Sequence, residues 1–279
     1  MKVLVFDVDN TLTPPRRTLR PEMAAALAAL PYRFHVAAGS NLALVTEQLL
    51  TPLQAFGFRG TFDAFVCNGA DRHRCRVGTA VSVEPLRHFD LAQHLGPADL
   101  GVLLRTLEVF LAAPDFTLPD RIPIVGAQII DRGSMINVAP IGRPERMDEA
   151  AFRSRQLFVA FDQATGFRRR MLEQLRAALA PIIERRHLRI TLGGETSFDI
   201  VAAGNDKSYP LRTLLREGAS SLTYFGDALF EGGNDAIVLE FIASHGSAAP
   251  VSAVSVAGWE DTLAHLLRLT AAAHARSGA

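Results

Sequence analysis

The segment MKVLVFDVDNTLT (residues 1–13) decides the fold, because it joins an apolar run to a turn that carries two carboxylates. The run predicts a short buried strand. Alternation along its edge lets Asp7 and Asp9 face the same side, and the turn that follows exposes both. Two carboxylates in one small volume favour a bound metal, a raised pKa, or both. The alternative is a turn in which Asp and Asn merely cap backbone groups.

Outward from this strand, apolar runs alternate with helical patterns. Helical stretches at 22–30 and 42–50 are followed by apolar runs at 33–40 and 62–69. This rhythm predicts βαβ crossovers and a parallel sheet. Ligands of such sheets bind at the carboxyl ends of the strands, which here carry residues 7–9, 39–40 and 68–69.

From about residue 72 the pattern becomes that of an inserted α+β unit. Its antiparallel strands are predicted over 81–86, 125–133, 134–142, 188–194 and 197–204, with helices near 98–112 and 166–184. The βα rhythm then returns, with helices near 209–217 and 260–273, strands over 220–227 and 253–258, and a frayed end at 274–279. We therefore predict a core over 1–78 and 204–279 and an inserted domain over 79–203.

Composition excludes several classes of partner. Lys+Arg and Asp+Glu are both 29, so no overall charge draws the protein to nucleic acid or to an anionic membrane. No stretch stays apolar over the ~20 residues that a spanning helix needs, so we expect a cytoplasmic protein with a small solute as its partner. Cys67 and Cys75 are not spaced for a metal site and are expected to be buried thiols.

Three further polar residues follow predicted core strands or lie in polar loops. Ser40 offers a hydroxyl to phosphate oxygens, Lys207 a point charge and Asp227 a hard oxygen ligand for Mg²⁺. Taken singly, Ser40 is explained as a helix cap, Lys207 as a solvated residue, and Asp227, Asn234 and Asp235 as turn formers. Their joint order along the chain favours phosphoryl transfer.

This order resembles the four motifs of the haloacid dehalogenase superfamily, which has a Rossmann-like α/β core. The resemblance implies that Asp7 is a nucleophile that becomes phosphorylated and that Asp9 is the general acid/base. Ser40 and Lys207 would hold the phosphate. Mg²⁺ would be bound by Asp7, the backbone carbonyl of Asp9, and Asp227, with Asp235 as a further metal residue. The insert lies where one subclass has a large cap domain, termed C2 or type IIB.

Longer motifs resemble the phosphomannomutases of the eukaryotic type. They are DVDNTLTPPR (7–16), MINVAPIGR (135–143), GGETSFDI (193–200), GNDKSYPL (204–211) and FGDALFEGGND (225–235). By this resemblance the phosphate and hydroxyls of the sugar are bound by Arg16, Arg132, Arg143, Ser197 and Asp199. A third cap arginine is assigned to Arg155, with Arg153 and Arg146 as alternatives. The alternative explanation of each of these arginines is surface solvation or pairing with a carboxylate.

Three positions depart from the family pattern. Asn10 stands where the family usually has Gly, and Asn enters left-handed backbone conformations more readily than most residues. Cys67, before Asn68, replaces an acidic residue that the family often has. After residue 235 only Glu240 is available for the family's second, structural cation, so we do not carry that site over.

The resemblance implies a phosphomannomutase that works through a hexose 1,6-bisphosphate. A sugar-phosphate phosphatase on the same scaffold is the alternative, because water attack on a phosphorylated Asp7 needs no new residue. A non-catalytic binding protein would be expected to lack Asp7 or Lys207. Cap helices of this family can pair, so the apolar stretch 100–111 predicts either a homodimer contact or a cover for the cap sheet.

Overall fold

The computed structural model describes residues 2–230, 232–245 and 250–277. It divides into two compact units. We call them the core unit (Met1–His88, Asn205–Glu231 and Asp235–Ala279) and the cap unit (Phe89–Gly204 and Gly232–Asn234). Among the described residues, no helix is both long enough and apolar enough to span a membrane.

The core unit contains a seven-stranded sheet in the order β11-β10-β1-β2-β3-β4-β5. The first five of these strands are parallel, and β4 and β5 extend the edge as an antiparallel hairpin. The strands are β1 (Lys2–Phe6), β2 (Arg33–Ala37), β3 (Gly60–Val66), β4 (Asp71–Val77), β5 (Val81–Arg87), β10 (Ser221–Gly226) and β11 (Val251–Ser255). The parallel α/β core predicted from the sequence is confirmed.

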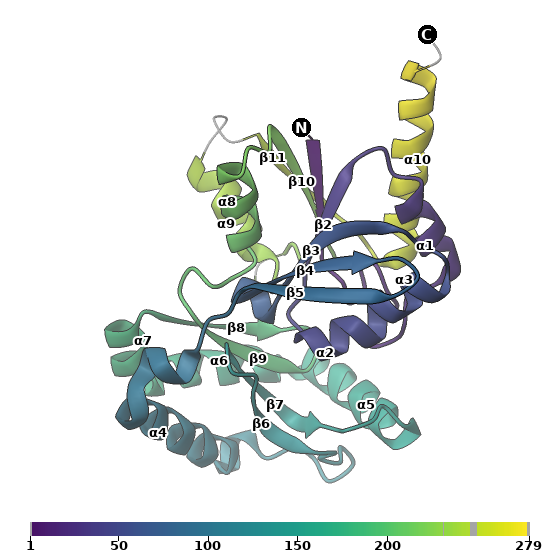
Figure 1. The fold of residues 1–279 in the computed structure, drawn as a ribbon. Helices are drawn as coiled ribbons and strands as arrows, with labels where there is room; N and C mark the ends of the chain where they lie inside the picture. Colours follow the sequence, from purple (N-terminus) through teal and green to yellow (C-terminus); the bar gives the residue numbers. More distant parts are fainter. Residues whose placement is uncertain (1, 231, 246–249, 278–279) are drawn as a thin grey trace. The chain divides into compact units, whose positions relative to one another are not determined.

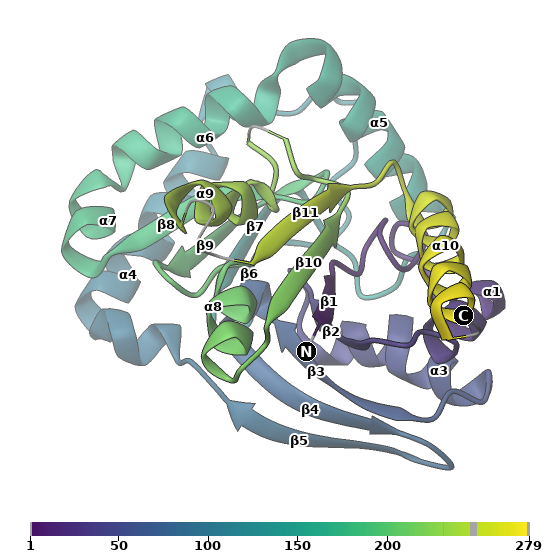
Figure 2. The same cartoon turned by 90° about the horizontal axis from the view of Figure 1, so that it is seen from above.

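Helices cover both faces of this sheet (Figures 1 and 2). One face packs against α8 (Tyr209–Arg216) and α9 (Ala236–His245) through a cluster that includes Val3, Val5 and Leu214. On the other side lie α1 (Pro21–Ala28), α3 (Thr51–Ala55) and α10 (Trp259–Ser277). The remaining helical segments are α2 (Leu42–Val45), the π-helix η1 (Thr46–Leu50) and the 3₁₀ turn η2 (Cys67–Gly69).

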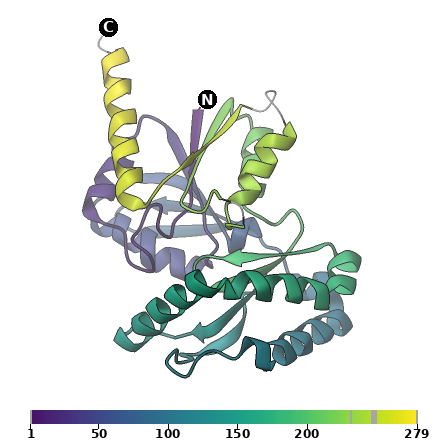
Figure 3. The same ribbon diagram turned by 180° about the vertical axis from the view of Figure 1, so that it is seen from behind.

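The cap unit contains a four-stranded antiparallel sheet in the order β6-β7-β9-β8. The strands are β6 (Ala127–Asp131), β7 (Ile136–Arg143), β8 (Leu188–Gly193) and β9 (Ser197–Ala202). Its helices are α4 (Leu91–Leu111), α5 (Glu149–Thr165), α6 (Phe167–Ala178) and α7 (Ala180–Arg186), with a 3₁₀ turn η3 (Pro114–Phe116). Figure 3 views this unit from the side opposite to Figure 1.

Alternation along two cap strands separates an apolar face from a polar one. Ile136 and Val138 of β7, and Phe198 and Ile200 of β9, join the apolar cluster that the helices cover. The residues that alternate with them therefore lie on the opposite face of the sheet, and these include Asn137, Ser197 and Asp199.

The predicted start of the inserted domain at residue 79, and the assignment of strand 81–86 to it, need correction. β5 pairs antiparallel with β4 in the core sheet, and the cap unit begins at Phe89. The antiparallel pattern alone does not mark the insert, because a hairpin can also extend the edge of a parallel sheet. At the other end the cap unit's long segment ends at Gly204 and the core resumes at Asn205.

The structure bears on two predictions about helices. The stretch 100–111 lies in α4, where Leu103 and Leu107 are buried in the cap core and Val102 and Val109 are exposed, so its buried side covers the cap interior. The homodimer contact stays a prediction. The C-terminal helix continues to Ser277 rather than fraying from residue 274, while residues 278–279 of the predicted frayed end lie outside the described residues.

Candidate active site

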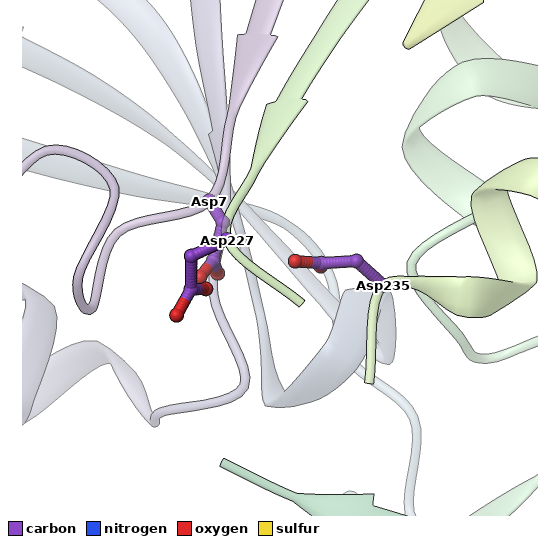
Figure 4. A group of neighbouring side chains, drawn as sticks. All are labelled: Asp7, Asp227 and Asp235. Atoms are coloured by element: carbon purple, nitrogen blue, oxygen red, sulfur yellow. The ribbon is translucent and has the colours of Figure 1, made fainter. Parts of the chain in front are cut away.

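Three carboxylates meet at the carboxyl end of the core sheet. Asp7 directly follows β1, Asp227 directly follows β10, and Asp235 immediately precedes α9. One oxygen of each lies within 4.8 Å of the others, and Figure 4 shows the three side chains together. We call this set the carboxylate triad. β1 and β10 are adjacent parallel strands, which brings two residues 220 positions apart in sequence to one edge.

Lys207 neutralises part of this charge. Its Nζ donates to Asp7 Oδ1 and to Asp235 Oδ1, both at 2.7 Å, and its side chain is 1% exposed. Burial by itself lowers the pKa of Lys207, but the carboxylates of Asp235 and Asp7 outweigh it and raise the pKa overall. A charged ammonium is therefore held against the proposed nucleophile.

Asp235, which accepts a hydrogen bond from the Lys207 ammonium, is itself held by two further donors. The Tyr224 hydroxyl donates to Asp235 Oδ1 at 2.6 Å, and the Ala228 N–H donates to Asp235 Oδ2 at 3.2 Å. Sequence reasoning missed Tyr224. The available signal was a phenol that alternates with Leu222 along the strand and so shares its buried face, because a buried Tyr hydroxyl usually needs a partner.

Burial disfavours the negative charge of the triad. Burial raises the pKa of Asp7 well above its usual range; the Lys207 ammonium opposes the rise, and Asp235 and Asp227 add to it. Burial also raises the pKa of Asp227, against the hydrogen bond that Asn10 Nδ2 donates to Asp227 Oδ2 at 2.9 Å. Three hard oxygen donors in a site of excess negative charge fit a divalent cation such as Mg²⁺.

Asp9 lies outside the triad. Its carboxylate accepts the Arg16 N–H at 2.5 Å and lies 3.3 Å from Arg16 Nε. Asn10, which follows Asp9 in the sequence, has a φ of 63°, and Arg16 has a φ of 57°. The left-handed conformation at Asn10 agrees with the expectation that Asn substitutes there for Gly.

Ser40 lies in the loop after β2 and is buried. Its carbonyl accepts the Cys67 N–H at 2.8 Å, so this loop is tied to the one after β3. Cys67, Asn68 and Gly69 in that second loop all have positive φ, at 51°, 58° and 94°. Cys67 and Cys75 are both buried thiols, as predicted.

The cap unit holds a second polar group, which we call the cap cluster: Asn137, Arg143, Ser197 and Asp199. Arg143 Nη2 donates to Ser197 Oγ at 2.8 Å, and Asn137 Nδ2 donates to Asp199 Oδ1 at 2.6 Å. Three of these residues were expected from the sequence. Asn137 was not, although it stands inside the quoted motif 135–143; its regular alternation with buried apolar neighbours was the available signal.

The other cap arginines differ in their surroundings. Arg155 of α5 forms an ion pair with Glu195, two residues before Ser197, whereas the alternatives Arg153 and Arg146 are exposed. Arg132 lies in the turn between β6 and β7, where its N–H donates to the Met135 carbonyl at 2.9 Å. This ion pair ties Arg155 to the segment that leads into Ser197.

Known proteins resemble this chain over most of its length. A family model for eukaryotic phosphomannomutase matches residues 27–269. A phosphomannomutase of Arabidopsis thaliana is 32% identical over 244 residues, which cover 85% of this chain and 87% of that protein. One from Schizosaccharomyces pombe is 31% identical over 237 residues, which cover 84% of this chain and 83% of that protein.

Solved structures share the fold at low sequence identity. An IMP-bound IMP-nucleotidase of Plasmodium falciparum has a TM-score of 0.64 at 12% identity, covering 96% of this chain and 68% of that chain. A trehalose-6-phosphate phosphatase related protein has a TM-score of 0.51 at 12% identity, covering 98% and 99% of the two chains. The fold is that of the haloacid dehalogenase superfamily, and the chain belongs to the eukaryotic phosphomannomutase family.

Proposed function

We propose that this protein interconverts mannose 6-phosphate and mannose 1-phosphate, with transient phosphorylation of Asp7 and a hexose 1,6-bisphosphate as intermediate. Membership of the family supports the substrate class. The observation that carries the chemistry is the Lys207 ammonium, 2.7 Å from both Asp7 and Asp235 in a buried site. A carboxylate can approach a phosphate dianion only where positive charge offsets their repulsion.

Mg²⁺ is the cofactor that the triad fits. Asp7 and Asp227 are the residues that would hold it, with the Asp9 carbonyl as the further ligand that the resemblance implies. Asp235 already accepts three donors, so its main role is to orient Lys207. When bound, the metal supplies positive charge beside the transferring phosphoryl group.

The chain's own residues divide the remaining work. Asp7 attacks phosphorus, and the bond to the sugar oxygen breaks as Lys207 balances the charge on the phosphoryl oxygens. Asp9 carries the proton to or from that sugar oxygen, while Arg16 fixes the Asp9 carboxylate through two contacts. Ser40 is proposed as a phosphate ligand. Arg132, Arg143, Arg155, Ser197 and Asp199 are proposed to recognise the rest of the sugar phosphate.

Phosphorus NMR of the purified protein with mannose 1-phosphate, Mg²⁺ and a catalytic amount of hexose 1,6-bisphosphate tests this function. We expect mannose 6-phosphate to appear with wild type and not with Asp7→Asn, because an amide cannot accept the phosphoryl group. Release of inorganic phosphate alone would assign a phosphatase on the same Asp7 chemistry. Equal turnover by the Asp7→Asn variant would exclude Asp7 as the nucleophile.

A further inference from the structure

One buried amide joins three of the residues proposed to bind the sugar phosphate. Asn137 is 1% exposed, and its Nδ2 donates to Asp199 Oδ1 at 2.6 Å and to Ser197 Oγ at 3.0 Å. Its Oδ1 accepts from Arg143 Nε at 3.1 Å. The strand register places Asn137 directly opposite Asp199, so both side chains lie on one face of the cap sheet.

The chemistry of the neighbours fixes which way the amide points. Asp199 offers carboxylate oxygens, and Arg143 has only N–H donors. The NH₂ group of Asn137 must therefore face Asp199 while its oxygen faces Arg143. A carboxylate at this position would present no donor to Asp199, and an aliphatic side chain would satisfy neither neighbour.

The Ser197 hydroxyl forms hydrogen bonds within the same network. Its hydroxyl donates to the Gly193 carbonyl at 2.6 Å, and its oxygen accepts from Asn137 Nδ2 and from Arg143 Nη2. A Cβ added at Gly193 would lie 2.7 Å from Asp199 Oδ1, so the carboxylate fills the space beside this glycine. Arg143 and Asp199 are thus held by partners of fixed geometry.

We propose that Asn137 is a positioning residue that holds the guanidinium of Arg143 and the carboxylate of Asp199 ready for a ligand carrying both a phosphate and hydroxyl groups. The guanidinium suits the phosphate, and the carboxylate accepts from hydroxyls. This inference rests on the proposed function, because it assigns Asn137 to the binding of that sugar phosphate. Asn137 acts through its two neighbours, which are the groups that touch the ligand.

The test compares Asn137→Asp and Asn137→Leu, both close to Asn in size, with wild type and with a Gln128→Leu control. Gln128 lies in the same sheet, and its Nε2 donates to the Pro140 carbonyl at 2.6 Å. We expect the KM for mannose 1-phosphate to rise roughly tenfold or more in the Asn137 variants and to stay unchanged in the control. The kcat at saturating mannose 1-phosphate should fall much less than the KM rises, because Asn137 does not touch the Asp7 chemistry.

A pH profile separates positioning from general damage. In Asn137→Asp, the new carboxyl donates to Asp199 once it is protonated, so the KM should fall back toward wild type as the pH is lowered. Asn137→Leu should show no such recovery. An unchanged KM in folded variants, or a loss confined to kcat, would overturn the proposal.

A readout without ligand keeps this inference separate from the proposed function. The Arg143 Nε–H, bonded to Asn137 Oδ1, should give a protected ¹⁵N NMR signal in wild type that is lost in Asn137→Leu. If wild type turns over no hexose phosphate, the proposed function fails and this signal alone decides the positioning role. Protection that persists in the variant contradicts it. Asn137→Ser replaces any variant whose thermal unfolding shows that it does not fold.

Discussion

At the scale of single residues, the loss of the buried Tyr224 hydroxyl gives the most specific test of the site. Its hydroxyl donates to Asp235, the carboxylate that also binds Lys207. Removing a donor to a buried carboxylate costs about 2 kcal/mol. We expect Tyr224→Phe to lower the free energy of unfolding in urea by about that amount and to reduce kcat. An unchanged free energy of unfolding together with an unchanged kcat in Tyr224→Phe would contradict the role of Asp235.

Asp227 gives a second test at this scale. Mg²⁺ should raise the melting temperature of wild type, because it offsets the charge that burial disfavours in the triad. Differential scanning calorimetry of Asp227→Asn should show a much smaller rise. Glu240→Gln, which lies in α9 outside the triad, should respond like wild type. A loss of the response in Glu240→Gln instead would place the cation elsewhere.

At the scale of elements, two glycines allow the start of β6 to lie close to the end of β7. Gly142 has a φ of 76°, and a Cβ there would lie 2.2 Å from the Gly126 carbonyl oxygen. Gly142→Ala therefore needs both backbone strain and a shift of the neighbouring chain. We expect it to destabilise the protein by about 3 kcal/mol or more and to raise the KM for the sugar phosphate, because Arg143 follows directly.

The matched control is Gly78→Ala in the turn between β4 and β5. A Cβ at Gly78 would meet nothing within 4 Å. Its free energy of unfolding should change by no more than about 0.5 kcal/mol. Chemical denaturation of both variants measures the difference, and similar losses would show that the Gly126–Gly142 approach is not limiting.

Elements also show what periodicity predicts and what it misses. The strands β1, β2 and β3 are predictable because short apolar runs that alternate with helical stretches are local signals. β5 was assigned to the wrong sheet, since the partner of an antiparallel strand is not written in its own pattern. α5 was not predicted as a helix, although Asp148 caps its start by accepting the Ala151 N–H at 2.8 Å.

At the scale of the whole molecule, acid stability should depend on His35. It accepts the Asp63 N–H at Nδ1, and burial lowers its pKa to about 4, with Asp63 opposing and Arg72 adding to the shift. Its unfolded-state pKa is 6.5, so below that pH the unfolded chain binds more protons. Stability is therefore lost as the pH falls from about 6.5 toward 4.

We expect this contribution to reach roughly 2 kcal/mol between pH 7 and pH 5. Replacing the imidazole by the non-titrating amide in His35→Asn should flatten the dependence of the unfolding free energy on pH by that amount. Urea denaturation across the range measures it. An unchanged slope would mean that His35 takes up its proton at the same pH in the folded and in the unfolded protein.

The sequence by itself determined the parallel core, the inserted antiparallel unit and the chemical character of the site. Asp7, Lys207 and Asp227 each stand beside a local pattern of strand, loop or turn, and residue type at such places limits the chemistry. Motif resemblance then named the family, which the comparisons show.

Only the tertiary structure decided which side chains meet. Lys207 and Asp7 are 200 residues apart, and Asn137 and Ser197 are 60 apart, yet each pair lies within hydrogen-bonding distance. Tyr224 on Asp235 and Asn137 between Arg143 and Asp199 depend on strand partner and register. Periodicity tells which face a side chain occupies, but the register between strands distant in sequence sets its neighbours, and that register exists only in the folded chain.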